Sequence, residues 1–207
     1  MTNIILNVDL ATDGLAETEG ESFRRLVLVQ EEGRRLSRLI ENVLTFSRQE
    51  QGRLALHPAA CVPAEIIRDV VRQFSAALAR CSIQVEVTGG AEQACRLDPD
   101  AFAQILTNLV SNVEKYAAEG GYLGIQSCLE GSRLTVTVTD RGSGIPVAEA
   151  EKIFRPFYRL HNEVKEGVSG TGLGLSIARE LALRMGGELR LLPSETGAVF
   201  ELTIPVV

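Results

Sequence analysis

A glycine-rich turn that runs directly into an apolar helical segment constrains this chain more than any other feature. Residues 167–178 read Gly-Val-Ser-Gly-Thr-Gly-Leu-Gly-Leu-Ser-Ile-Ala, and the apolar periodicity continues to Met185. The glycines at 170, 172 and 174 leave backbone N–H groups free at the positive end of a helix dipole, which suits a phosphate chain. Because glycines also punctuate ordinary loops, the turn alone leaves a plain-loop interpretation open.

Two common phosphate motifs do not fit this turn. A P-loop requires a Lys-Ser/Thr pair after its last glycine, and none is present. A dinucleotide site requires a strand before the turn and an acidic residue about 20 positions later, at the end of a second strand. Neither is predicted here, so phosphate binding would need another fold.

Composition and charge describe an ordinary soluble globular chain. Of its 207 residues, 45% are hydrophobic and 23% are charged. The net charge of −6 argues against a duplex nucleic-acid partner, and no basic run indicates a membrane surface. No membrane-length apolar run or signal peptide is found, so we expect a cytoplasmic chain without direct membrane contact. Four widely spaced cysteines are expected to be buried, reduced thiols: Cys61, Cys81, Cys95 and Cys128.

Residues 1–52 predict an antiparallel helical hairpin. An apolar stripe over residues 4–15 indicates one helix, and a longer helix follows the polar connection at 17–21. The longer helix carries a heptad seam from Leu26 to Val43. A lone hairpin cannot bury this seam, so we expect it to dimerise into a four-helix bundle. Packing of the hairpin on the rest of its own chain remains the alternative.

Residues 53–207 predict an α+β domain, a two-layer sandwich with one mixed sheet, because helices and hairpin strands alternate irregularly. Helices are expected over 63–80, over about 99–118 and after the glycine turn. Strands are expected over 53–62, 83–87, 95–97, 122–129, 134–139, 189–192 and 199–204.

The helix predicted before residue 118 carries a polar stripe opposite its core face. The stripe consists of Gln104, Asn108, Asn112 and Lys115, at helical spacing. Its amides offer oxygen ligands for a hard cation, and its ammonium group suits phosphate. A plain solvated face is the alternative.

The predicted strand at 134–139 ends in Asp140-Arg-Gly-Ser-Gly-Ile-Pro146. Its aspartate can accept a hydrogen bond while the glycines let a planar ligand approach the backbone. A simple Asx turn is the alternative. The following segment offers Phe154 and Phe157 as packing anchors, and the polar stretch 161–167 suits a lid.

Four motifs, in this order, resemble the asparagine, first glycine, phenylalanine and second glycine boxes of sensor histidine kinases. They are Asn-Leu-x-x-Asn-x-x-Lys-Tyr at 108–116, Asp-x-Gly-x-Gly-Ile at 140–145, Phe-x-x-Phe-Tyr-Arg at 154–159 and Gly-Thr-Gly-Leu-Gly-Leu at 170–175. The predicted hairpin is similar to that family's dimerisation domain. The resemblance covers essentially the whole chain and implies a core that binds ATP and Mg²⁺.

The resemblance also implies roles for individual residues. Asn112 would coordinate Mg²⁺, and Asn108 and Lys115 would contact phosphate or support that shell. Asp140 would accept from the adenine amino group, within a pocket formed by Tyr116, Gly142, Gly144 and Ile145. The loop Gly170, Thr171, Gly172, Leu173 and Gly174 would cradle phosphates, and Arg159 would reach the γ-phosphate.

The phosphoacceptor box of that family, His-Glu-x-x-x-x-Pro, is absent. The chain's two histidines are His57 and His161, and neither is followed by Glu. We therefore expect a kinase core truncated after its acceptor box, which binds Mg-ATP without labelling itself. The parent protein, which could be anchored in a membrane, would pass phosphate from ATP to a histidine and then to a response-regulator aspartate. Its partners would be a second copy, through residues 1–52, and a receiver domain.

Two alternatives remain. The first is an ATPase of the gyrase, Hsp90 and MutL kind, which would have a glutamate base one helical turn before the metal-binding asparagine. This chain has Asn108 there, and an amide cannot take a proton from water. The second is a non-enzymatic module that keeps the ATP fold for dimerisation or regulation.

Overall fold

The computed structural model describes residues 20–51, 55–160 and 171–206. The chain divides into two compact units, with the boundary between Leu54 and Ala55. Within the described residues, no helix is both long enough and apolar enough to cross a membrane.

The described part of the first unit is one long helix, α2, which spans Gly20–Glu50. This helix was expected as the second arm of the hairpin. The other predicted arm, over residues 4–15, lies outside the described residues, as does Gly52. Among the described side chains of α2, five on or beside the seam are exposed: Val29, Leu36, Ile40, Val43 and Leu44. The helix therefore carries apolar surface that a partner helix could cover.

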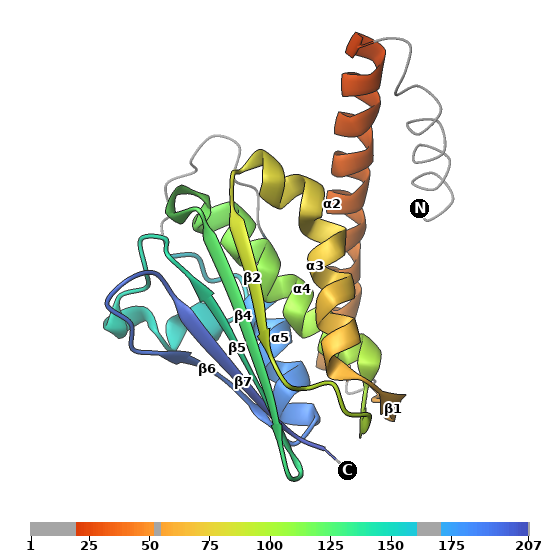
Figure 1. Ribbon diagram of the computed structural model, residues 1–207, viewed down its shortest axis with the longest axis vertical. Helices are drawn as coiled ribbons and strands as arrows, with labels where there is room; N and C mark the ends of the chain where they lie inside the picture. The colour runs from red at the N-terminus through yellow and green to blue at the C-terminus, as the bar shows by residue number, and fades with distance from the viewer. Residues whose placement is uncertain (1–19, 52–54, 161–170, 207) are drawn as a thin grey trace. The chain divides into compact units, whose positions relative to one another are not determined.

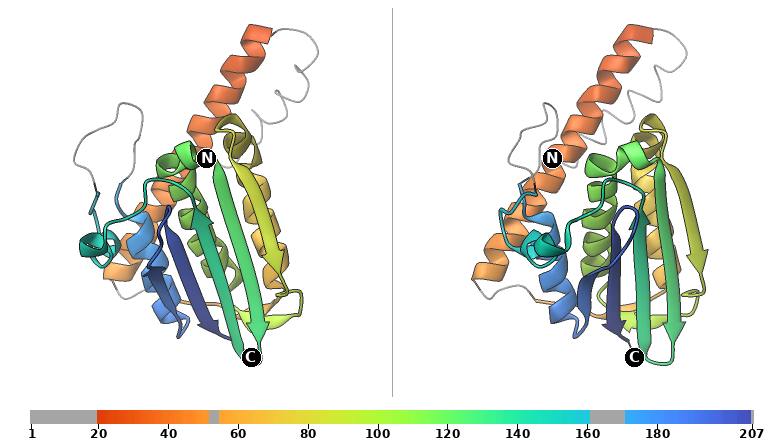
Figure 2. Two further views of the ribbon diagram at one scale, coloured as in Figure 1. Left: turned by 60° about the vertical axis from the view of Figure 1, so that its left-hand side comes forward. Right: turned by 90° about the vertical axis from the view of Figure 1, so that its left-hand side faces the viewer.

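The second unit is a two-layer α+β sandwich, in which three helices cover one face of a mixed sheet (Figures 1 and 2). The helices are α3 (Pro63–Arg80), α4 (Pro99–Tyr116) and α5 (Gly174–Arg184). In spatial order the strands are β2 (Gln84–Gly89), β4 (Tyr122–Glu130), β5 (Arg133–Asp140), β7 (Val199–Pro205) and β6 (Glu188–Leu192). Strands β2 and β4 are parallel, and the other neighbours are antiparallel. The predicted fold class is confirmed.

A separate antiparallel ribbon pairs β1 (Ala59–Cys61) with β3 (Cys95–Leu97). The sequence analysis expected a longer strand over 53–62 and a single sheet. Among the described residues of that range, strand structure is confined to β1, because Pro58 cannot donate to a ladder and the partner strand is equally short. Three short 3₁₀ helices complete the unit: η1 (Ala118–Gly120), η2 (Val147–Glu149) and η3 (Lys152–Phe154).

Helix starts and apolar spacing explain how α3 and α4 form and pack within the helical layer. Pro63 occupies the first turn of α3, where its missing N–H has no role. The Asp98 side chain caps α4 by accepting from the Ala101 backbone N–H at 2.9 Å. The helices then bury apolar side chains at helical spacing, namely Ile67, Val70, Phe74 and Leu78 on α3 and Phe102, Leu106, Leu109 and Val113 on α4.

Strand β5 shows how the sequence places a carboxylate in the core layer. Its side chains alternate, so that Leu134, Val136 and Val138 are buried and the intervening side chains are only partly covered. Asp140 continues the buried series and is 7% exposed. The strand thus ends with an acidic group on its apolar face.

The cysteines depart from expectation in one respect. All four are free thiols, but Cys128 is exposed and Cys61 and Cys81 are only partly covered. Cys95 alone among them is buried. Cys128 lies on β4, where side chains alternate between the core and the solvent, and it falls on the solvent side.

Candidate nucleotide-binding site

Asp140 is fixed by two backbone donors that come from different parts of the chain. Its Oδ1 accepts from the Gly142 N–H at 2.8 Å and from the Ala198 N–H at 3.1 Å. The first hydrogen bond forms an Asx turn, which was the alternative to a ligand-binding role for Asp140. The second crosses from the segment that leads into β7, which a local turn does not require. Among the described residues both hydrogen bonds go to Oδ1, so Oδ2 is left to accept from a ligand.

The two glycines after Asp140 let neighbouring segments of the chain approach this turn closely. A Cβ added at Gly142 would lie 2.7 Å from the Ala117 Cβ, at the end of α4. Gly144 has φ +72°, and a Cβ there would lie 3.0 Å from the Gly197 carbonyl oxygen. A Cβ at Gly142 would also lie 3.2 Å from the Asp140 Oδ1, so a side chain there would crowd the carboxylate. Ile145 follows and is partly exposed.

Two further glycines, which sequence reasoning did not connect with the site, support the same turn. A Cβ at Gly120 would lie 2.2 Å from the Arg141 carbonyl carbon. At Gly197, where φ is +66°, a Cβ would lie 2.0 Å from the Asp140 carbonyl oxygen. Gly197 belongs to the turn predicted between the last two strands. Its local sequence gave no sign that this turn meets Asp140.

Helix α4 brings the polar stripe to the site, but the stripe is not a plain solvated face. Asn108 is 6% exposed, whereas Asn112 and Lys115 are partly exposed. Tyr116, the last residue of α4, is 53% exposed. The spacing of 4 and 3 residues keeps Asn108, Asn112 and Lys115 on one side of the helix. The polar stripe is therefore buried at Asn108 and becomes more exposed toward the C-terminal end of α4.

The second glycine motif meets the buried end of that stripe. A Cβ added at Gly174, the first residue of α5, would lie 3.3 Å from the Asn108 Oδ1. Leu173 is buried, and its carbonyl accepts from the Ser176 hydroxyl at 2.8 Å. Thr171 Oγ1 lies 3.4 Å from the Leu173 backbone nitrogen. The start of α5 is therefore held closely against α4, while Gly170 and the predicted lid at 161–167 lie outside the described residues.

The phenylalanine motif joins the glycine motif through the backbone. The Phe157 N–H donates to the Gly172 carbonyl at 3.0 Å, and Gly172 has φ +71°. A Cβ at Gly172 would lie 2.7 Å from the Phe157 carbonyl carbon. Phe157 itself has φ +63° and is 64% exposed, so its predicted role as a packing anchor is wrong. The left-handed backbone turns its ring away from the core.

Phe154 is the packing anchor that the sequence predicted. Its ring meets Phe200 edge to face, with 6.4 Å between ring centroids. The Arg179 guanidinium lies 4.7 Å from the Phe154 ring centroid and pairs with Glu151 at 2.8 Å. These contacts attach η3 to α5 and β7, and thereby position the segment that reaches Gly172.

A charged cluster stabilises the neighbouring turn. Glu149 accepts from the Tyr158 hydroxyl and from the Lys152 ammonium group, the latter at 3.0 Å. The Tyr158 hydrogen bond, followed by the Lys152 one, lowers the pKa of the Glu149 carboxyl. The same bond raises the pKa of Tyr158. Arg159 comes next and is partly exposed.

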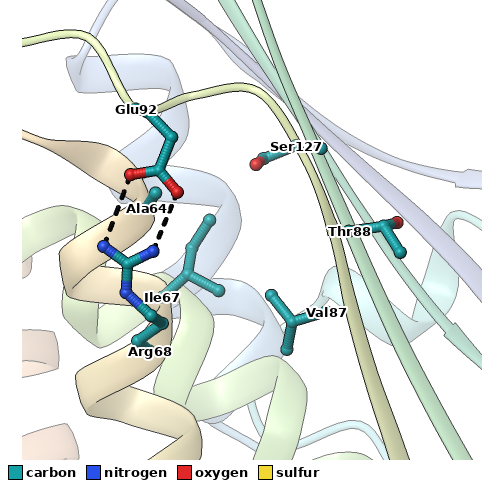
Figure 3. A pocket seen from close by; sticks show the side chains of 8 residues that line it. Ala64, Ile67, Arg68, Val87, Thr88, Glu92 and Ser127 are labelled. Atoms are coloured by element: carbon teal, nitrogen blue, oxygen red, sulfur yellow. Dashed lines mark hydrogen bonds and ion pairs between the residues drawn. The ribbon is translucent and has the colours of Figure 1, made fainter.

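A separate small cavity lies between α3 and the β2 edge of the sheet, toward the other end of β4 (Figure 3). Its volume is about 150 Å³, and the Arg68–Glu92 ion pair borders it at 2.8 Å. Ligand pockets usually measure about 300–1,000 Å³, so this cavity is too small for a nucleotide. It shares no lining residue with the Asp140 site.

The Asp140 site offers a distinct set of groups to a ligand. It has a buried carboxylate oxygen at one end, amide oxygens along α4, and glycine backbone at the start of α5. At each of these glycines the neighbouring chain approaches so closely that a Cβ would crowd it. Among the described residues, no group of three or more His, Cys, Asp or Glu side chains could hold a metal ion. A cation here would therefore depend on amide oxygen and on the ligand's own oxygens.

Comparisons with known proteins identify the family of this chain. The profile of the family described as histidine kinase-, DNA gyrase B-, and HSP90-like ATPase matches residues 97–207. The sensor histidine kinase GlrK of Escherichia coli strain K12 is 34% identical over 184 residues, which cover 86% of this chain and 37% of GlrK. The alginate biosynthesis sensor protein KinB of Pseudomonas aeruginosa is 32% identical, covering 86% of this chain and 30% of KinB. This chain thus spans well under half of these relatives.

A solved structure extends the likeness to three dimensions. The catalytic domain of the histidine kinase ThkA superposes with a TM-score of 0.65 at 30% sequence identity. The alignment covers 72% of this chain and 96% of the ThkA domain.

Proposed function

We propose that this chain, which belongs to the histidine kinase-, DNA gyrase B- and HSP90-like ATPase family, binds Mg-ATP at Asp140 for phosphoryl transfer. It has the ATP-binding catalytic core of a sensor histidine kinase. The observation that carries this proposal is the Asp140 carboxylate. It is buried, it is fixed through one oxygen, and it stands beside Gly142, where a Cβ would lie 3.2 Å from its Oδ1. The whole protein would pass the γ-phosphate to a histidine and then to a response-regulator aspartate.

The adenine end of the nucleotide belongs at Asp140. An adenine amino group is a donor, and the carboxylate presents its second oxygen as an acceptor. Gly142, Gly144 and Ile145 would form the adjoining wall, and Tyr116, which is exposed at the end of α4, would line the pocket. The site discriminates by hydrogen-bond direction: a base with a carbonyl oxygen in place of the amino group would face the carboxylate acceptor to acceptor.

The phosphate end belongs between α4 and the start of α5. Asn112 would offer its side-chain oxygen to Mg²⁺, which the phosphates also ligate, and Asn108 and Lys115 would contact phosphate or support Asn112. Glycine backbone from Gly170 to Gly174 would supply N–H donors to phosphate oxygens, and Arg159 would reach the γ-phosphate. The Mg²⁺ ion supplies charge neutralisation to the transferred phosphoryl group.

The residue at position 108 favours phosphoryl transfer to another group over hydrolysis. A hydrolytic relative would use a carboxylate base there, whereas Asn108 has a neutral amide. Its side chain is buried against Gly174 and is placed to support neighbouring groups. We therefore place this chain with the kinases of the family.

The assignment to the kinases also implies two partners. A second copy would cover the apolar surface of α2, and a receiver domain would accept the phosphate. The chain's own histidines do not provide an acceptor. His57 precedes β1, where its backbone N–H donates to the Asp98 Oδ2 at 2.6 Å, and His161 lies outside the described residues. We place this part of the protein in the cytoplasm, where ATP is available.

Incubation with γ-labelled ATP tests the reaction class. We expect no acid-labile label on the unmodified chain and only trace release of inorganic phosphate. A chain extended at its N-terminus by a segment that carries the family's His-Glu-x-x-x-x-Pro box should gain acid-labile label, and Asn112→Ala should abolish it. Rapid release of phosphate without label, from both chains, would contradict the kinase proposal and favour the ATPase alternative.

A further inference from the structure

The β1–β3 ribbon places two cysteines opposite each other. Cys61 ends β1 and Cys95 begins β3, and the two residues are direct partners in the antiparallel register. They are separated by 34 positions in the sequence, so only the fold brings them together. The other two cysteines differ: Cys81 ends α3 as its C-cap, and Cys128 pairs with Thr135 in the main sheet.

The register places the two side chains within reach of a covalent bond. Directly opposed residues of an antiparallel pair have Cα atoms about 4.5–5.5 Å apart and side chains on the same face. Disulfides span Cα separations of about 4.4–6.8 Å. The ribbon therefore provides suitable backbone geometry while both cysteines are free thiols.

The surroundings give the two thiols different access to a reagent. Cys95 is 7% exposed, whereas Cys61 is partly exposed. Burial raises the pKa of both thiols. A backbone hydrogen bond with Leu97 partly offsets this rise in the pKa of Cys61, and the charge of Asp98 adds to it. Cys61 further raises the pKa of Cys95. The influence of Cys61 on the pKa of Cys95 agrees with the short separation that the register requires. Cys61 is the accessible member of the pair, and Cys95 is the buried one.

We propose that Cys61 and Cys95 form a redox modification site that closes to a disulfide when a peroxide reaches Cys61. Although its pKa is raised, the partly exposed Cys61 loses its proton in a small fraction of molecules. That thiolate attacks a peroxide oxygen, the O–O bond breaks, and hydroxide leaves, which gives a sulfenic acid. The Cys95 thiolate then attacks the Cys61 sulfur, and the S–O bond breaks as hydroxide departs. In total, two thiols and one hydrogen peroxide give one disulfide and two waters. A dithiol reductant restores both thiols.

The disulfide would link the two segments that lead into α3 and α4. β1 precedes Pro63, the first residue of α3, and β3 precedes Asp98, the cap of α4. The closed loop contains α3 and β2, so oxidation would remove conformational freedom from the unfolded chain. This inference concerns the ribbon alone and does not depend on nucleotide binding.

Peptide mapping under non-reducing conditions tests the proposal on the complete chain. After brief treatment with hydrogen peroxide, we expect a cross-linked peptide pair that joins Cys61 to Cys95 and a monomer lighter by two hydrogen atoms. The melting temperature should rise by about 5–10 °C and return to its starting value after dithiothreitol. Because the mapping uses the unmodified chain, it does not depend on any variant folding.

Serine variants provide matched controls. Cys61→Ser and Cys95→Ser should abolish both the cross-link and the melting shift, whereas Cys81→Ser and Cys128→Ser should leave both unchanged. The proposal is overturned if peroxide leaves Cys61 and Cys95 as separate thiols, or converts Cys61 to sulfinic acid without a bridge. It is equally overturned if the only disulfide found joins two chains through Cys128.

Discussion

Asp140 depends on residues that lie almost sixty positions further along the chain. Ala198 donates to its carboxylate and Gly197 touches its carbonyl group, and both belong to the segment that enters β7. The close approach is possible because Gly197 has no Cβ and adopts φ +66°. The position of Asp140 therefore depends on Gly197, a residue without a side chain to contact a ligand.

Substitution at Gly197 should damage both stability and binding. In Gly197→Ala, the new Cβ would start 2.0 Å from the Asp140 carbonyl oxygen, so the turn must move. We expect the free energy of unfolding to fall by about 2–4 kcal/mol. Affinity for Mg-ATP should fall at least about tenfold, because the acceptor shifts with the turn. Chemical denaturation and titration calorimetry measure the two effects.

Gly131→Ala is the matched control for that variant. Gly131 has φ +57°, but nothing lies within 4 Å of the Cβ it would gain. Backbone strain alone should then lower stability by about 1–2 kcal/mol and leave nucleotide affinity unchanged. Equal affinity losses in the two variants would show that the contact with Asp140 has no part in binding.

Helix α4 is the element on which the phosphate end of the site is built, and its start is fixed by Asp98. One carboxylate oxygen accepts from the Ala101 N–H at 2.9 Å and the other from the His57 N–H at 2.6 Å. The same side chain thus caps the helix and holds the segment that leads to β1. Because Asn108 and Asn112 follow along the same rigid helix, their positions depend on this cap.

Removal of the cap should cost more than an ordinary N-cap substitution. Asp98→Ala deprives two backbone N–H groups of their acceptor, one of them buried, and should lower the free energy of unfolding by about 2–3 kcal/mol. Asp100→Ala, an exposed position in the same first turn, should cost only a few tenths of a kcal/mol. Thermal melts of the two variants make the comparison. Equal melting temperatures would mean that the Asp98 contacts do not stabilise the helix start.

Local sequence signals predicted most elements of the second unit. Proline and aspartate marked the starts of α3 and α4, alternation marked β2, and the predicted strand pair matches β4 and β5 at nearly their observed bounds. The exceptions have local causes that propensity does not capture. Pro58 and a three-residue partner confine β1, and a left-handed backbone turns Phe157 outward.

At the scale of the whole molecule, the missing information was the order of the strands. The sequence placed the motifs on the correct helix, strand end and loop, and it predicted β6 and β7 as a pair. It could not show that β7 inserts between β6 and β5, which brings Gly197 and Ala198 to Asp140. Such pairing is settled by packing among distant segments. The roles of the individual site residues remain predictions that binding experiments must decide.

The most direct test of the account is calorimetric titration of Mg-ATP into the unmodified chain and into Asp140→Asn. The asparagine keeps a carbonyl oxygen for the Gly142 and Ala198 donors but replaces the second acceptor oxygen with an NH₂ donor. We predict that the unmodified chain and the neighbouring exposed-site control Ser143→Ala bind alike, while Asp140→Asn loses about 10- to 100-fold in affinity. Undiminished binding by Asp140→Asn, or no binding by the unmodified chain, would contradict the assignment of the adenine site.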